Sequence, residues 1–208
     1  MPGDIFYPGE EQIQNLGLDI PSLSGKRVLD IGCGKVNLVR HLRKQGIDAE
    51  GIDTDVPEEP YIINGDWRRI SREDGTYDVV VSHFGFLHGS LTHSRLARDP
   101  KLVSGISRPD QRRITKEVRD SFLGGLREAL RVLKPDGVLR YFPSSYGGFR
   151  EEAERLVTRA GYSIQEELVP VSRAYLLDQV ISPFPPEIRE RQKREYSYRT
   201  VIRRTQVT

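Results

Sequence analysis

The stretch that decides the fold is Arg27-Val-Leu-Asp-Ile-Gly-Cys-Gly34. Its first half is a short apolar run of the kind that forms a buried strand, and its second half is a glycine-rich turn. Residues 37–44 follow with leucine and valine on one helical face, and Gly46 supplies a C-terminal stop. A strand, a glycine turn and a helix in this order predict the first unit of an alternating α/β fold.

The alternation continues along the rest of the chain. Further strands are predicted at residues 49–53, 61–65, 78–82, 138–142, 163–168 and 198–204. Helices are predicted around residues 10–16, 107–130 and 151–160, and a turn at 134–137. This pattern predicts a three-layer α/β sandwich with a mostly parallel, seven-stranded sheet. No clear crossover helix precedes the last strand, so we expect that strand to be antiparallel.

Composition excludes several classes of protein. The 208 residues include 32 basic and 30 acidic ones, so the whole chain has no polyanion-binding character. The single cysteine, Cys33, excludes an intramolecular disulfide and a multi-cysteine zinc site. No apolar run approaches the ~20 residues of a membrane span, and the N-terminus lacks the features of a signal peptide. We therefore expect a single cytoplasmic domain over residues 1–208, without membrane contact.

Polar residues mark the ends of four predicted strands, namely Asp30, Asp53, Asp66 and Ser82. In an open α/β sheet the ligand binds at the carboxyl ends of the strands, so these side chains indicate a ligand with several hydroxyl and amine donors. Gly32 and Gly34 let the backbone approach such a ligand closely. Asp53 follows Gly34 at a distance suited to accepting both hydroxyls of a ribose. An adenosine-containing ligand is the resulting prediction.

Five segments, in order and at natural spacing, resemble the class I methyltransferase family. They are residues 28–34, 51–55, 64–67, 77–82 and 130–137. The resemblance covers roughly residues 26–169 and the final strand. It implies a Rossmann-like fold, S-adenosylmethionine as the cofactor, and methyl transfer as the activity.

The resemblance also implies roles for individual residues. Asp30 would hold the amino group of the cofactor, and Gly32, Cys33 and Gly34 would border its methionine part. Asp53 would bind the ribose, while Thr54 would pack against the adenine. Asp66 would accept a hydrogen bond from the adenine amine, Trp67 would wall the pocket, and Ser82 would face the cofactor amine.

One position departs from the family pattern. Val36 stands where the family usually has a third glycine, and a β-branched residue restricts the backbone there and adds bulk near the cofactor's carboxypropyl group. Lys35 could compensate by pairing with the cofactor carboxylate. The departure leaves open a non-catalytic, cofactor-binding module as an alternative function.

The histidines suggest one catalytic candidate. His83 directly follows a predicted strand, where this family places substrate-facing residues, and is our candidate for a general base or substrate contact. The alternative is a solvated loop histidine, and His88 is a weaker candidate. His83, His88 and His93 do not stack on one helical face and have no carboxylate cluster beside them, so no metal site is predicted.

No motif in the sequence identifies the molecule that would accept the methyl group. Residues 1–25 form a polar leader, and residues 91–119 are longer than the usual family link, which predicts a substrate-side insertion or lid. Basic residues outnumber acidic ones in residues 91–119 and 189–204. A small molecule is the favoured acceptor, with RNA or another anionic macromolecule left open. An NAD(P)-dependent oxidoreductase is a weaker alternative, because the third glycine of the dinucleotide fingerprint is missing.

Overall fold

The fold is a seven-stranded mixed sheet. The computed structural model describes residues 8–54, 56, 59–86, 108–143, 149–170 and 196–205. Its strands are β1 (Arg27–Ile31), β2 (Asp48–Asp53), β3 (Ile62–Asn64), β4 (Tyr77–His83), β5 (Leu133–Phe142), β6 (Tyr162–Pro170) and β7 (Tyr196–Arg204). They lie in the order β3-β2-β1-β4-β5-β7-β6, and β7 is antiparallel to both of its neighbours. The predicted mostly parallel sheet with an antiparallel last strand is confirmed.

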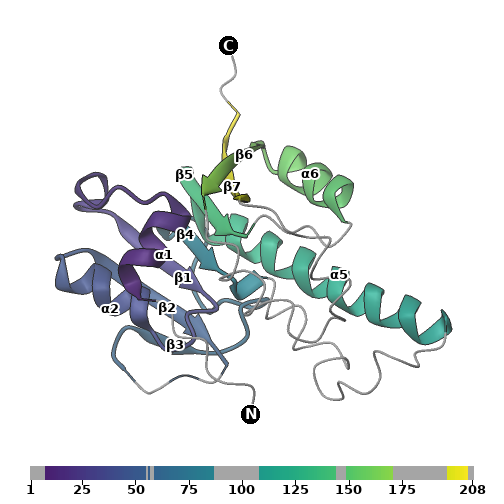
Figure 1. The fold of residues 1–208 in the computed structure, drawn as a ribbon, viewed down its shortest axis with the longest axis horizontal. Coiled ribbons are helices and arrows are strands. Elements are labelled where there is room, and N and C mark those ends of the chain that lie inside the picture. The colour runs from purple at the N-terminus through teal and green to yellow at the C-terminus, as the bar shows by residue number, and fades with distance from the viewer. Residues whose placement is uncertain are drawn as a thin grey trace.

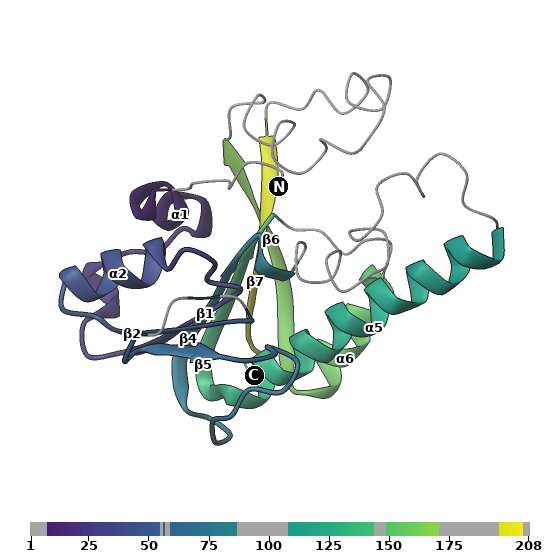
Figure 2. The ribbon, with the colours of Figure 1, turned by 90° about the horizontal axis from the view of Figure 1, so that it is seen from below.

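Helices cover both faces of the sheet. They are α1 (Gly9–Leu16), α2 (Asn37–Lys44), α5 (Arg108–Val132), α6 (Arg150–Arg159) and the short 3₁₀ helix η1 (Pro21–Leu23). Figures 1 and 2 show α1 and α2 on one side of the sheet, with α5 and α6 on the other. The predicted three-layer sandwich is therefore confirmed. Among the described residues, no helix is long and apolar enough to cross a membrane.

Two apolar cores lie on opposite faces of the sheet, and strand geometry explains the division. Successive side chains of a strand point to opposite faces. Val28 accordingly joins the cluster beneath α1 and α2, while Leu29 joins the cluster beneath α5 and α6. The apolar stripe predicted on the long helix is confirmed at Phe122 and Leu126, both of which are buried in the second cluster.

One predicted segment differs from the expected form, and the predicted insertion overlaps a helix. Residues 134–137, predicted as a turn, are included in β5, but Leu133 pairs with Tyr77 and Val138 pairs with Val79, so the intervening residues bulge out of the ladder. Within the predicted insertion, residues 108–119 form the first turns of α5. Residues 91–107 lie outside the described part of the chain.

Candidate functional site

The candidate site lies where β1, β2 and β4 reach the carboxyl edge of the sheet. The three strands are parallel, and Asp30 of β1 is in register with Gly51 of β2 and Val81 of β4. Beyond β1 the chain folds back against β2, because the amide of Gly32 donates to the carbonyl of Ile52 (N–O 2.8 Å). The ends of strands that are distant in sequence are thereby brought together at one edge.

Gly32 is required by the close approach of a second loop. Its φ is 72°, and an added Cβ would lie 2.5 Å from the Cα of Gly85, which follows β4. At Gly85 an added Cβ would lie 2.2 Å from the carbonyl oxygen of Ile31. The two glycines therefore allow two backbone segments to touch beside the site. The sequence reasoning missed Gly85, whose only local signal is a glycine shortly after a buried strand.

Asp53 holds its carboxylate against the glycine turn. Oδ2 accepts a hydrogen bond from the Gly34 amide (2.9 Å), and Oδ1 accepts one from the Thr54 amide (2.7 Å). Each carboxylate oxygen can accept two hydrogen bonds, so both still have capacity for a ligand. Three of the predicted site residues, Gly34, Asp53 and Thr54, are thus held together by hydrogen bonds to the Asp53 carboxylate.

Asp30 is the electrostatic anomaly of the site. The residue is 2% exposed, and among the described residues its Oδ1 has no hydrogen-bond partner. Burial, followed by the negative charge of Asp53, raises the pKa of the Asp30 carboxyl well above its ordinary value. A buried polar atom without a partner is rare in proteins. A ligand group that is positively charged and donates a hydrogen bond would give Oδ1 a partner and would stabilise the charged form of the Asp30 carboxyl.

Cys33 lies in the same turn and is chemically quiet. It is 8% exposed, and burial together with the charges of Asp30 and Asp53 raises the pKa of its thiol. A thiol held in its protonated form is a poor nucleophile, so Cys33 fills space rather than reacting. Its sulfur would lie 2.7 Å from a Cβ added at Gly51, which explains the glycine at that point of β2.

Val36 ends the turn in a backbone conformation that glycine normally adopts. Its φ is 65° and its ψ is 16°, the left-handed helical region, and the residue is fully buried. A β-branched residue in this region is strained. The side chain packs in the apolar cluster beneath α1 and α2. The valine side chain, which was expected near the carboxypropyl group of the ligand, therefore lies in the core instead.

Ser82 joins β1 to the segment after β4. Its hydroxyl donates to the Ile31 carbonyl (2.9 Å) and accepts from the Phe86 amide (3.0 Å), and the residue is 1% exposed. Ser82 is thus brought to the site, where its hydroxyl fixes the position of the backbone around Gly32. Its position at the end of an apolar strand predicted that Ser82 lies at this edge. That position did not predict its hydrogen bonds to the backbone.

Asp66 and Trp67 follow β3 and have partners away from the glycine turn. Both oxygens of Asp66 accept hydrogen bonds from Arg68, through Nε (2.9 and 3.0 Å) and Nη2 (2.6 Å). Trp67 is 3% exposed and packs against Phe86, and its ring occupies the space beside Gly125 of α5. The structure places Trp67 in the core rather than on an open wall.

His83 is packed between α1 and the sheet. It is 7% exposed, and its Nε2 lies 3.1 Å from Nδ2 of Asn15, which donates to it. The ring stacks on Phe142 with centroids 5.6 Å apart and meets Phe84 edge-on. His88 and His93 lie outside the described residues. Within the described residues, no group of three His, Cys, Asp or Glu side chains could hold a metal ion.

Comparison with known proteins finds a likeness to methyltransferases in sequence and in fold. Residues 10–89 match the family described as Methyltransferase domain, whereas no curated protein matches the chain. A solved [4+2]-cyclase, SpnF, is 16% identical, with a TM-score of 0.52 over 94% of this chain and 79% of its own. A geranyl diphosphate methyltransferase is 14% identical, with a TM-score of 0.51 over 95% and 84%. A protein from Galdieria sulphuraria assigned as a sarcosine dimethylglycine methyltransferase is 16% identical, with a TM-score of 0.52 over 96% and 86%.

Proposed function

We propose that this chain, a class I methyltransferase domain with a Rossmann-like fold, binds S-adenosylmethionine at the carboxyl edge of β1, β2 and β4 and transfers its methyl group to a small-molecule acceptor. The family match over residues 10–89 includes the whole of β1, β2 and the glycine turn between them. The observation that carries the proposal is the buried, unpartnered Oδ1 of Asp30, next to the Asp53 carboxylate.

The residues at this edge fit the proposed cofactor. The ammonium of its methionine part would supply the donor and the positive charge that Asp30 lacks. The two ribose hydroxyls would use the remaining acceptor capacity of Asp53, whose position is already fixed by two backbone amides. Gly32 lets the backbone after β4 come close to the turn, and a Cβ added at Gly34 would have no described atom within 4 Å.

The chemical task left to the protein is alignment and exclusion of water. S-adenosylmethionine supplies a methyl group that is already activated by its positively charged sulfur. The protein must hold the cofactor so that an acceptor atom can approach in line with that methyl group. Asp30 would hold the amino group of the cofactor and Asp53 its ribose, while the close contact between Gly32 and Gly85 limits movement of the turn after β1.

We assign His83 to packing rather than to proton transfer. Its ring lies against Phe84 and Phe142, and Asn15 donates to its Nε2. A general base must reach the proton that it removes, and a ring enclosed in this way has its Nε2 turned toward α1. The acceptor would then need a nucleophile that is reactive on its own or a base elsewhere.

The acceptor class rests on the names of structural neighbours. Geranyl diphosphate and sarcosine or dimethylglycine, the compounds in two of those names, are small molecules. The [4+2]-cyclase has the same fold, so the fold by itself does not establish methyl transfer. Cofactor binding and turnover therefore have to be measured separately.

The proposal is tested in two steps. Calorimetric titration with S-adenosylhomocysteine should give saturable binding to the wild type and no measurable binding to Asp53→Ala. Incubation with methyl-labelled S-adenosylmethionine should then transfer label to the small-molecule fraction of a cell extract. Label in the RNA fraction alone would overturn the acceptor class. Binding without transfer to any fraction would instead make the chain a non-catalytic cofactor-binding module.

A further inference from the structure

A second cavity lies at the opposite edge of the sheet. It has a volume of about 600 Å³ and is bounded by the connection between α1 and β1, by β4 and β5, and by the end of β7. Lys26 precedes β1, and Val79 and Val138, which pair with each other on the parallel strands β4 and β5, line the cavity. The glycine turn follows the other end of β1, so this cavity is separate from the proposed cofactor site.

The walls of this cavity carry an excess of positive charge. Its four basic residues are Lys26, Arg140, Arg203 and Arg204, and its two acidic residues are Asp19 and Asp136. In the part of the chain that the structure describes, neither acid forms an ion pair with any of the four bases. The two acids that line the cavity are therefore not in direct ion pairs with its four bases.

Arg140 is a partly buried member of this group. Its side chain is only 14% exposed, and its Nη1 donates to the carbonyl of Leu16 (3.3 Å) and lies 3.7 Å from Glu167. The same oxygen of Glu167 accepts a closer hydrogen bond from Arg199 (2.6 Å). Among the described residues, Nε and Nη2 of Arg140 have no partner. A guanidinium has five donors, so most of this one's donors make no bond to the described protein and are open to a ligand.

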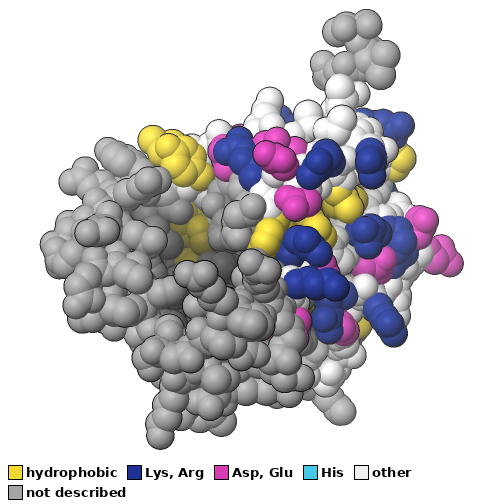
Figure 3. Space-filling view, turned by 90° about the vertical axis from the view of Figure 1, so that its right-hand side faces the viewer, with side chains coloured by type: hydrophobic (Ala, Val, Ile, Leu, Met, Phe, Trp, Pro, Cys, Tyr) yellow, Lys and Arg dark blue, Asp and Glu magenta, His cyan; other side chains and the backbone are white. Residues whose placement is uncertain are grey.

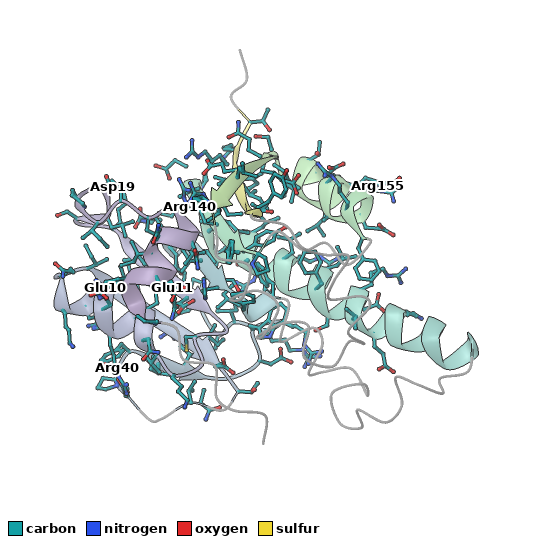
Figure 4. The ribbon with its side chains drawn as sticks, in the orientation of Figure 1. Glu10, Glu11, Asp19, Arg40, Arg140 and Arg155 are labelled. Atoms are coloured by element: carbon teal, nitrogen blue, oxygen red, sulfur yellow. The ribbon has the colours of Figure 1, made fainter. Side chains whose placement is uncertain are left out.

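The charges around Arg140 also favour binding of an anion. Burial lowers the pKa of Arg140, and the charges of Arg199 and Arg203 lower it further, against a raising effect from Glu167. One carboxylate thus faces three guanidinium groups. In Figure 4, Arg140 lies beside the end of α1, and Asp19 stands on the connection that follows that helix. An anion placed in the cavity would meet the unused donors and offset the repulsion.

We propose that this cavity binds a small multivalent anion bearing phosphate or carboxylate groups, with the partly buried Arg140 as its anchor and Lys26, Arg203 and Arg204 at its rim. Arginine suits this role because its planar guanidinium matches both groups with paired hydrogen bonds. The volume is within the range of about 300–1,000 Å³ found for small-molecule sites. The site needs no cofactor, so it stands or fails independently of the methyl-transfer proposal.

The test is thermal unfolding with sodium pyrophosphate and with sodium citrate as probes, each compared with sodium chloride at equal ionic strength. We expect a saturable rise in melting temperature for the wild type, since a ligand of the folded state stabilises it by mass action. Arg140→Met should abolish the rise, and Arg203→Gln should weaken the apparent affinity about tenfold, as expected for one lost contact of about 1.4 kcal/mol.

Arg155→Met is the matched control. Arg155 lies on α6, on the other side of the sheet, with its side chain 62% exposed. Figure 3 shows that face, where basic side chains are interspersed with acidic ones. The control variant should respond to both probes like the wild type. Because Arg140 also binds α1, Arg140→Met could fail to fold, in which case Lys26→Gln combined with Arg203→Gln takes its place.

Three results would overturn the proposal. The first is a wild type that responds to pyrophosphate and citrate no more than to chloride. The second is an equal loss of response in Arg155→Met and Arg203→Gln, which would indicate a general charge effect. The third is a response that saturating S-adenosylhomocysteine removes while Arg203→Gln leaves it intact, which would place the anion at the cofactor edge.

Discussion

The carboxylate of Asp53 accepts a hydrogen bond from the backbone amide of Gly34 at 2.9 Å, although nineteen residues separate the two in sequence. The contact joins the end of β2 to the turn after β1. It holds the acidic group in place before any ligand arrives, which reduces the cost of ordering that group on binding. Gly34 and Asp53, whose spacing in the sequence drew attention to them, are thus joined by a direct hydrogen bond.

Replacing Asp53 by alanine should abolish measurable binding of S-adenosylhomocysteine. A hydrogen bond to a charged group contributes roughly 1.5–3 kcal/mol, and two ribose hydroxyls would lose their acceptor at once. The domain should still fold, because the released amides of Gly34 and Thr54 belong to exposed hydrogen bonds. Calorimetric titration and circular dichroism measure the two effects.

The matched control for this change is Asp48→Ala. Asp48 stands at the other end of β2, where its half-exposed side chain pairs with Arg27 and Arg43. Its replacement should leave affinity unchanged. Comparable affinity in the two variants would show that the Asp53 carboxylate does not bind the ribose.

Replacing Asp30 by asparagine should separate binding from stability. The folded state raises the pKa of Asp30, so the folded protein holds this proton more tightly than the unfolded chain does. The contribution of Asp30 to stability therefore falls as the pH rises from its ordinary pKa of 3.8 through its raised folded value, and is constant above that. The free energy of unfolding of Asp30→Asn, relative to wild type, should rise across this window.

The same variant should bind S-adenosylhomocysteine at least tenfold more weakly, since a charge-assisted bond of roughly 1.5–3 kcal/mol to its ammonium is lost. Urea unfolding at a series of pH values and calorimetric titration supply both measurements. A variant with a pH profile parallel to that of wild type would mean that Asp30 is not the strained, buried charge inferred here.

At Val36 we expect glycine to be tolerated better than alanine. Alanine normally stabilises a protein relative to glycine. At a φ of 65°, however, alanine keeps the backbone strain and also loses the buried methyl groups of valine. Glycine loses the same packing but removes a strain of about 1–3 kcal/mol. The free energies of unfolding of Val36→Gly and Val36→Ala test this order, and a more stable alanine variant would contradict it.

The contact between Asn15 and His83 should contribute to stability rather than to turnover. Asn15→Ala and His83→Phe each leave a buried polar partner without its hydrogen bond, at a cost of about 1–3 kcal/mol. The double variant should be less destabilised than the sum of the two, because the contact between the two side chains can be lost only once. Denaturant unfolding of the four proteins measures this coupling. Normal stability with lost methyl transfer in His83→Phe would make His83 the general base.

Much of the fold and part of the site can be predicted from the pattern of side chains along short segments. The strand Arg27–Ile31 and the helix Asn37–Lys44 were predicted with the bounds that the structure shows, because a compact apolar run and a helical stripe are both local patterns. The placement of Asp30 and Asp53 at one edge follows from parallel strands. The role of Trp67 could not be predicted, because it depends on the space that Gly125 of a distant helix leaves for its ring.

The sequence by itself determined the alternation of strands and helices and the acids at the strand ends, since both depend on the side-chain pattern along short segments. It also determined the antiparallel last strand, because no crossover helix is predicted before it. Only the tertiary structure decided that His83 faces Asn15, that Gly32 touches Gly85, and that Arg140 lies among other cations with most of its donors unused. These relationships join segments far apart in the chain. They depend on how the layers pack, and burial, hydrogen bonding and charge are properties of that packing rather than of any local stretch.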